Sequence, residues 1–131
     1  MKAIHTSGKR KRAVARATLR AGKGRVTINN KDLDFFEPAI YKQRIQEPLV
    51  LAGPLAKEIA ISVNVFGGGC AGQADASRLA IGRALIKHNP KLKQTLLDYD
   101  RQILVADVRR KECSKPNRHG QARAKRQKSY R

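Results

Sequence analysis

The stretch that decides the fold is Ile59-Ala60-Ile61-Ser62-Val63-Asn64-Val65-Phe66, which runs directly into Gly67-Gly68-Gly69. Every second residue from Ile59 to Val65 is a branched apolar residue, the period of a strand with one buried face. A helix is expected to follow from about Gln73 to His88. Its small residues suit close packing on a sheet: Ala74, Ala76, Ala80, Gly82 and Ala84. A strand that leads straight into such a helix indicates a helix layer on a sheet.

A second alternating stretch lies upstream, at residues 12–20. Three alanines and Leu19 fall on one face of this predicted strand, and Arg12, Arg16 and Arg20 fall on the other. Exposed arginines on a strand are ordinary, so a solvated face is one interpretation. Like charges without an acid opposite repel each other unless an anion neutralises them. We therefore favour contact with phosphates.

The sequence between these two strands predicts a hairpin and short helical pieces. A flexible turn at 21–24 precedes 25–29, which is expected to be the returning strand of the hairpin. Residues 37–46 suit a helix with Pro38 in its first turn, and 48–53 suit one or two further turns. The apolar contacts expected for the 37–46 helix are Ile40, Tyr41 and Ile45.

Downstream, Asn89 and Pro90 are expected to end the long helix and to begin another. The core contacts expected for that last helix are Leu92, Leu96 and Leu97. The element order β-β-α-β-α-α predicts an α+β fold, in which helices pack on a small mixed sheet.

The net charge of +19 is concentrated at the two ends of the chain. Residues 1–25 contain nine Lys/Arg and no acid, 26–108 contain ten against nine acids, and 109–131 contain ten against Glu112 alone. Such a charge distribution is typical of a protein whose ends lie along nucleic acid. Residues 1–108 are expected to form one compact domain. Residues 109–131 hold too few apolar side chains to fold alone and are expected to order only on binding.

Composition also argues against other classes of protein. No apolar run is long enough to cross a membrane, and the basic Lys9–Arg12 interrupts any apolar leader at the N-terminus. The ends lack the bulky apolar residues of a basic membrane-surface helix. Cys70 and Cys113 lack a CxxC partner, so reduced thiols are expected rather than a zinc site. We expect a cytoplasmic protein without metal or cofactor.

The segment 67–72, GGGCAG, satisfies the dinucleotide-binding pattern G-x-G-x-x-G. The residues about 20 positions on include Lys91 and Lys93 instead of the acid that would bind a ribose, and no P-loop Gly-Lys-Ser/Thr follows. Two interpretations stay open and are compatible: a tight turn from strand to helix, and backbone amides that bind a nucleic-acid phosphate. His5, His88 and His119 belong to no catalytic arrangement, so no enzyme is expected.

Four segments resemble the family of universal small-subunit ribosomal protein nine. They are 67–85 (GGGCAGQADASRLAIGRAL), 22–29 (GKGRVTIN), 104–112 (LVADVRRKE) and 127–131 (QKSYR), in the family's order along essentially the whole chain. The ending Ser-Tyr-Arg together with the GQADASR segment resembles an archaeal-like member. Cys113 and Ser114 stand where bacterial members usually have basic residues.

The resemblance implies a fold of the ribosomal S-five domain-two-like type, and a place in the head of the small subunit on its rRNA. It implies that the last residues approach the anticodon stem-loop of the peptidyl-site tRNA: Lys128, Ser129, Tyr130 and Arg131. Neighbouring small-subunit proteins are the other expected partners, and no homo-oligomer is expected. The rival interpretations are a free RNA- or DNA-binding module, such as an RNA chaperone, and more distantly a nucleotide-dependent enzyme.

Charge, pattern and resemblance together give the expected rRNA-binding residues. They are Lys9, Arg10, Lys11, Arg12, Arg16, Arg20, Lys23, Arg25, Gly68, Gly69, Gln73, Arg78, Arg83, Arg109, Arg110, Lys111, Lys115, Arg118, His119, Arg123, Lys125 and Arg126.

Overall fold

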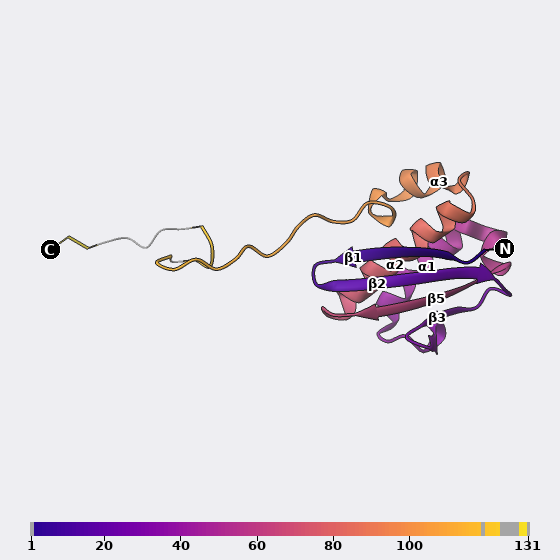
Figure 1. The fold of residues 1–131 in the computed structure, drawn as a ribbon, viewed down its shortest axis with the longest axis horizontal. Helices are drawn as coiled ribbons and strands as arrows, with labels where there is room; N and C mark the ends of the chain where they lie inside the picture. Colours follow the sequence, from indigo (N-terminus) through magenta and orange to yellow (C-terminus); the bar gives the residue numbers. More distant parts are fainter. Residues whose placement is uncertain (1, 119, 124–128, 131) are drawn as a thin grey trace.

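The computed structural model describes residues 2–118, 120–123 and 129–130, and these form an α+β fold (Figure 1). The strands are β1 (Ile4–Arg10), β2 (Ala13–Ala21), β3 (Val26–Ile28), β4 (Lys31–Asp32) and β5 (Ile59–Phe66). The α-helices are α1 (Ala39–Ala52), α2 (Cys70–His88) and α3 (Leu92–Tyr99). Three short 3-10 helices complete the fold: η1 (Leu33–Phe35), η2 (Gly53–Lys57) and η3 (Arg101–Ile103).

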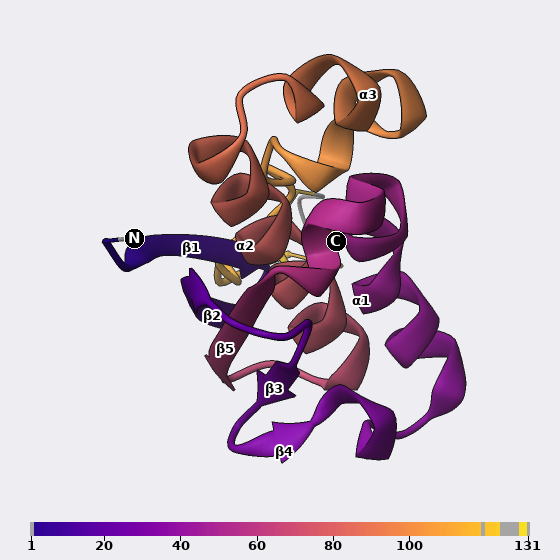
Figure 2. The same cartoon turned by 90° about the vertical axis from the view of Figure 1, so that its right-hand side faces the viewer.

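The five strands form one mixed sheet in the order β1-β2-β5-β3-β4. β3 runs parallel to β5, and every other pair of neighbours is antiparallel. Figure 2 shows α1 and α2 on the same side of this sheet, and none of the helices in the described residues lies on the opposite face. The expected small mixed sheet with helices packed on it is confirmed.

The predicted hairpin at residues 21–29 is wrong. β2 and β3 do not pair, because β5 lies between them. The glycines of the supposed turn instead bind the start of β5: the Gly22 N–H donates to the Glu58 carbonyl at 3.0 Å, and the Gly24 N–H donates to the Ile59 carbonyl at 2.9 Å. The antiparallel hairpins that form instead join β1 to β2 and β3 to β4. The sequence suggests that the strands on either side of this turn pair with each other. Both pair instead with β5, which begins more than thirty residues downstream.

The core lies between the sheet and α2, and its central contacts are made by small residues. The alternating pattern of β2 is confirmed, since Ala13, Ala15 and Ala17 are buried with Leu19. Gly8 of β1 lies opposite Ala15 and faces α2 so closely that an added Cβ would lie 2.2 Å from the Ala76 carbonyl oxygen. The small residues of α2 therefore bring its backbone against the sheet, as expected. Gly82 is the exception, because an added Cβ would meet Ile103 of η3.

α1 is one continuous helix in which Pro48 is buried, rather than the two pieces expected around that proline. A proline within a helix removes one backbone hydrogen bond, and burial of its ring against the core offsets part of that cost. Ile45 is fully buried and Tyr41 packs partly against the core. Ile40 is 63% exposed, so its expected role as an apolar contact is wrong.

The last elements close the core at one end of the sheet. Asn89 begins the turn before α3, where its side-chain oxygen accepts the Lys91 N–H at 3.1 Å. Leu96 and Ile103 are fully buried, and Leu92 packs partly against the core. From Val108 to Asn117 every residue is exposed, and Figure 1 shows this segment leaving the body. Among the described residues, no helix is both long and apolar enough to cross a membrane.

Candidate nucleic-acid interface

The sheet face without helices carries a row of cations. Strand alternation places the exposed side chains of Arg16 and Arg20 on this face, together with Lys9 from β1. Register puts Arg16 between Ser7 of β1 and Asn64 of β5. Of the residues that β1, β2 and β5 present here, none is acidic. We call this surface, with Arg12 at its edge, the open face.

The arginines of the open face have no internal counter-charge. In the part of the chain that the structure describes, no carboxylate forms an ion pair with Arg12, Arg16 or Arg20. The Arg16 guanidinium lies instead over the ring of Phe66, 5.8 Å from its centroid. Unpaired arginines on one sheet face favour an external anion, and guanidinium groups bind phosphate oxygens in a forked geometry.

A basic groove adjoins the open face at the turn between β1 and β2. It has a volume of about 940 Å³, and three segments meet around it. They are the turn at 10–12, the glycine loop (residues 67–69) with the start of α2, and residues 109–114, where the chain leaves the body. Of the expected rRNA-binding residues, the groove brings together Arg10, Lys11, Arg12, Gly68, Gly69, Arg109, Arg110 and Lys111. The two basic ends of the sequence are therefore neighbours in space.

The glycine loop shapes one wall of this groove. Gly67 and Gly68 have φ angles of 76° and 65°, and a Cβ at Gly67 would lie 2.6 Å from the Arg12 carbonyl oxygen. The Gln73 side chain donates a hydrogen bond to the Gly67 carbonyl at 3.2 Å, which holds the loop against α2. α2 begins at Cys70, three residues earlier than expected, and has no acid in its first turn. The free N–H groups and the dipole of α2 add positive potential beside the groove.

Several expected RNA contacts are occupied inside the protein. Arg10 pairs with Asp107 and Asp75, and so fastens β1 to α2 and to the segment after η3. Arg83 donates to the carbonyl oxygens of Leu104 at 3.0 Å and Ser7 at 2.9 Å. Their contact with RNA stays a prediction, and the geometry gives each of them a structural role.

Arg25 is also paired, although it is exposed. Its guanidinium donates two hydrogen bonds to Asp32, at 2.7 and 3.2 Å, which lower the pKa of that carboxyl group below its usual range. Lys23 is exposed in the neighbouring turn. RNA contact by these two residues stays a prediction.

Arg78 joins the three α-helices. Its side chain, 12% exposed, pairs from α2 with Glu47 of α1 and with Asp100 at the end of α3, the latter at 2.8 Å. Sequence reasoning counted Arg78 as an RNA contact because it could not locate these two carboxylates. The geometry makes Arg78 part of the helix packing.

We expect the substitution Arg78→Met to lower the free energy of unfolding by about 2 kcal/mol. Removing one member of a fully buried ion pair costs about 3–5 kcal/mol, and the effect is smaller here because Glu47 and Asp100 are 28% and 34% exposed. Urea denaturation at pH 7 measures the change. Arg44→Met is the matched control, because Arg44 is half-exposed and pairs with Asp75 on the surface. Equal losses in both variants would contradict a structural role for Arg78.

The same variant should also alter the acid stability of the protein. Burial raises the pKa of Asp100. Hydrogen bonds from the Gln102 N–H and from Arg78 lower it by more than burial raises it, so the net shift of the pKa is downward. A lowered carboxyl pKa stabilises the fold above the unfolded value of about 3.9, and this stability disappears as the pH falls through the folded value. Arg78→Met should therefore weaken the dependence of stability on pH below about 4.

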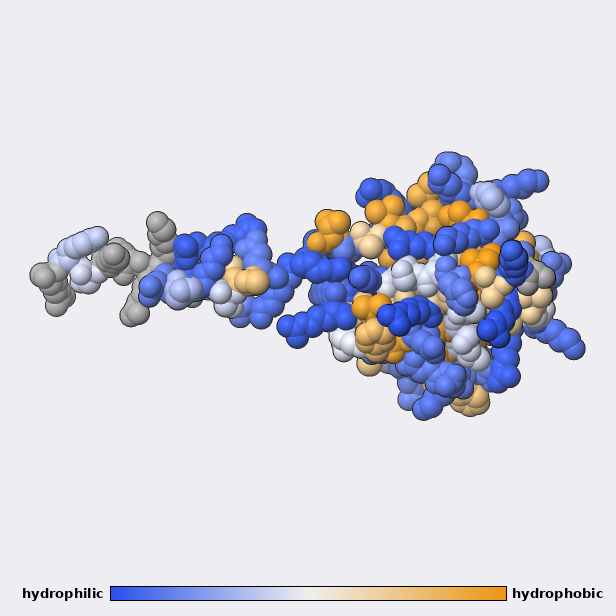
Figure 3. Space-filling model, in the orientation of Figure 1, coloured by the Kyte–Doolittle hydropathy of each residue, from blue (hydrophilic) through white to orange (hydrophobic). Residues whose placement is uncertain are grey.

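The described part of the C-terminal segment is basic and mostly exposed, with Arg118 and Ala122 half-buried. Arg123 pairs with Glu112, which lowers the pKa of that carboxyl group, and Arg118 donates to the Arg123 carbonyl at 3.2 Å. Lys115 is exposed, and Tyr130 is 91% exposed beside Ser129. Five expected site residues lie outside the described residues: His119, Lys125, Arg126, Lys128 and Arg131. Figure 3 shows hydrophilic residues along the described part of this extension.

Sequence reasoning missed the aromatic residue of the open face. Phe66 is 53% exposed on the central strand β5. The signal was present in the alternation of 59–66, because Phe66 shares its parity with Ser62 and Asn64 rather than with the buried valines.

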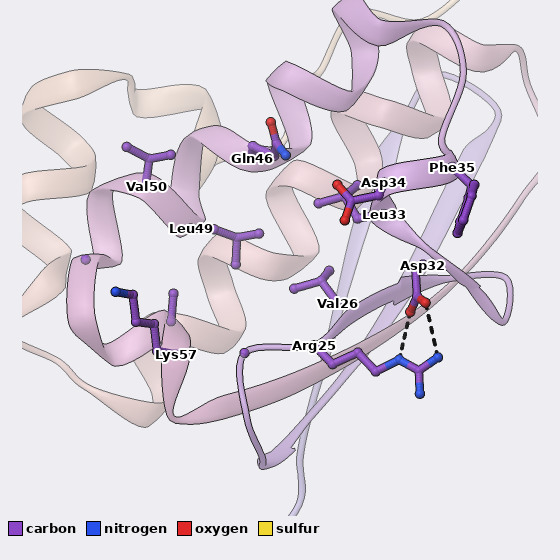
Figure 4. Close-up of a pocket in the computed structure, with 13 residues that line it drawn as sticks. Arg25, Val26, Asp32, Leu33, Asp34, Phe35, Gln46, Leu49, Val50 and Lys57 are labelled. Carbon is purple, nitrogen blue, oxygen red and sulfur yellow. Dashed lines mark hydrogen bonds and ion pairs between the residues drawn. The ribbon is translucent and has the colours of Figure 1, made fainter.

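A second hollow, away from the open face, has a different character (Figure 4). Its volume is about 830 Å³, and Val26, Leu33 and Leu49 line it together with exposed Phe35 and Val50. Its charged groups are mixed in sign, with the Arg25–Asp32 pair, Asp34 and Lys57 around it. Mixed charges do not favour a polyanion, so this hollow is not part of the candidate interface. No group of His, Cys, Asp and Glu in the described residues could hold a metal ion.

Fold and charge first define a class of protein: a small basic α+β domain whose open face and adjoining groove suit a polyanion. The family model of ribosomal protein S9/S16 matches residues 8–131, and the chain belongs to this family. It is 46% identical to small ribosomal subunit protein uS9 of Methanococcus maripaludis (strain C5) and 47% identical to that of Methanococcus vannielii. Each alignment spans 134 residues and covers both chains completely. The resemblance to archaeal members of this family is thus confirmed.

Proposed function

We propose that the protein is a structural constituent of the small ribosomal subunit in the cytoplasm, where it binds the small-subunit rRNA in the head region. The observation that carries this proposal is the row of arginines on the open face, which pair with no carboxylate among the residues that the structure describes. Family membership supports it, because the relatives are named as small-subunit proteins. Neighbouring ribosomal proteins are the other partners in this proposal, which includes no catalytic role and no homo-oligomer.

In this proposal, two parts of the chain have different roles in binding. Residues 1–108 form the body, which presents the open face to backbone phosphates and anchors the protein. Residues 109–131 form a basic arm that starts at the groove and follows the rRNA. At about 3.3 Å per residue, 23 extended residues reach roughly 75 Å. The end of the arm, Lys128–Arg131, approaches the anticodon stem-loop of the peptidyl-site tRNA.

The experiment that tests this function is sedimentation of a cell lysate, followed by washing of the collected small subunits at high salt. The wild-type protein should remain at one copy per subunit, measured against other subunit proteins. A free RNA chaperone would wash off or would sediment with bulk RNA. That outcome would reject the proposal.

The open face is tested in the same experiment with a triple variant, Arg12→Gln, Arg16→Gln and Arg20→Gln. Each lost phosphate contact reduces the salt dependence of binding by about 0.7–0.9 in the log–log slope, so the variant should dissociate at a distinctly lower salt concentration. The control triple variant, Lys31→Gln, Lys57→Gln and Arg101→Gln, removes the same charge from exposed sites off the open face. If both triple variants dissociate together, charge alone matters and the open face has no special role.

A further inference from the structure

Phe66 is an exposed aromatic residue in the middle of a cationic surface. It ends the central strand β5, lies opposite the partly buried Val14 of β2, and leaves 53% of its surface exposed. The Arg16 guanidinium lies 5.8 Å from the ring centroid, within the range of a cation–π contact. Strand geometry gives no structural reason for a large aromatic residue here, since the neighbouring outward positions of β5 carry Ser62 and Asn64.

The charges around Phe66 indicate what covers it. Arg12 lies beside the glycine loop that follows Phe66, so the ring is placed between the open face and the basic groove. The residues that β1, β2 and β5 present on this face include no carboxylate. An apolar protein surface would leave these arginines without counter-charges when it covered them. The partner must therefore cover an aromatic ring and also supply negative charge to the arginines. A nucleotide does both, because its base has a flat face for stacking and its phosphate neutralises the cations.

A polar hollow lies on the same face, next to the aromatic residue. Its volume is about 410 Å³, and its polar lining residues are Thr18, Thr27, Ser62 and Asn64, with Arg20 and the Asp32-paired Arg25 beside them. Ala60 and Ile61 complete the lining. Asn64 is two residues from Phe66 on the same side of β5, which corresponds to about 7 Å along the strand. Hydroxyl and amide groups donate and accept hydrogen bonds, so they suit base edges and ribose 2′-hydroxyl groups.

We propose that Phe66 and Arg16 form a stacking site for one unpaired base of the small-subunit rRNA, and that the adjacent polar hollow holds the neighbouring nucleotide. This inference rests on the proposed function and refines it. Bases within a duplex are stacked on each other and cannot lie on Phe66, so the open face selects a single-stranded segment such as a loop or bulge. The phosphate contacts of Arg12 and Arg20 then hold the strand on either side of the stacked base.

The test uses small subunits purified from cells that carry Phe66→Ala, Phe66→Leu or Phe66→Tyr in the full chain. Probing of their rRNA by 2′-hydroxyl acylation, which detects mobile nucleotides, should reveal an unpaired base that is protected in the wild type and in Phe66→Tyr because stacking restrains it. Its reactivity should rise about fivefold or more in Phe66→Ala and Phe66→Leu, because an aromatic ring is required and an apolar side chain is not enough. Phe35→Ala is the matched control, since Phe35 is 76% exposed beside the hollow of mixed charge; it should leave this base protected.

Affinity gives an independent measurement. The wild-type full chain should bind isolated small-subunit rRNA about 5- to 100-fold more tightly than Phe66→Ala at the same salt concentration, as expected for one stacked base. Thermal unfolding of both proteins checks that the exposed substitution leaves the fold intact, and their midpoints should agree.

Two results would overturn the inference. One is that no base changes its reactivity in Phe66→Ala subunits that retain the protein. The other is a photo-cross-link from p-benzoylphenylalanine at position 66 to a protein instead of to rRNA. Failure of the proposed function looks different, because the wild-type protein would then be missing from washed small subunits.

Discussion

Removal of residues 109–131 should strongly reduce the salt dependence of rRNA binding, and the basic residues of the body should retain the remainder. The deleted arm carries ten Lys/Arg against one acid, Glu112, which pairs with Arg123. Each phosphate neutralised contributes about 0.7–0.9 to the slope of log affinity against log salt concentration. We expect the slope to become shallower by about 6–8. Between 50 and 200 mM salt, the full chain should lose roughly 10³–10⁵-fold more affinity than the truncated one.

Filter binding to small-subunit rRNA at several salt concentrations measures this slope. The truncated chain should remain folded, because every buried apolar residue of the described structure precedes residue 104. Its thermal unfolding, compared with that of the full chain, checks this. An unchanged slope would mean that the arm does not lie along phosphates, and the proposed division into body and arm would then fail.

A shorter deletion, of residues 129–131 alone, is the matched control. It removes a single cation, so the salt slope should change by no more than about 1. Subunits should still assemble with this variant, while their affinity for peptidyl-site tRNA should decrease. Defective assembly with normal tRNA affinity would contradict the role proposed for the end of the arm.

The substitution Gly8→Ala should lower the free energy of unfolding by about 3 kcal/mol or more. A Cβ at this position would lie 2.2 Å from the Ala76 carbonyl oxygen and 2.8 Å from the Ala80 nitrogen, both in the backbone of α2. Overpacking in a core typically costs about 1–3 kcal/mol, and backbone atoms of a helix cannot rotate away as a side chain can. α2 would have to move off the sheet, and the buried contact between Ala15 and α2 would open with it.

Chemical denaturation measures the loss, and Gly69→Ala is its control. An added Cβ at Gly69 meets no atom within 4 Å, so this variant should lose no more than about 1 kcal/mol, the cost of replacing a glycine N-cap by alanine. If Gly8→Ala were as stable as the control, then α2 would not pack against β1 as closely as described.

Much of the fold could be predicted because several elements are encoded by local patterns. The alternation at 59–66 and at 13–19 is visible within eight residues, and both strands form with the expected faces buried. The long helix after the glycines was recognisable from its small residues. Such periodicities follow from the direction of successive side chains along a strand or helix, and this direction does not depend on the rest of the protein.

The candidate site was predicted less completely, since it depends on partners that are distant in sequence. Arg16 and Arg78 look alike in the sequence, because each is a single arginine with small or apolar neighbours and no adjacent acid. Arg16 lies on the open face over Phe66, whereas Arg78 lies between Glu47 and Asp100. Only the packing of α1 and α3 against α2 brings those two acids to Arg78. The same holds for Arg10, whose partner Asp107 is 97 residues away.

By itself, the sequence determined the class of fold, the long helix, the two alternating strands and the concentration of positive charge at both ends of the chain. These properties are local or additive, so they can be read without knowing which segments meet. The tertiary structure alone decided that β5 lies between β2 and β3 and that the turn at 10–12 meets residues 109–114 around one groove. It also decided which arginines of the described residues pair with a carboxylate. Strand pairing and ion pairing join residues far apart in the chain, and their geometry arises only when the whole core packs at once.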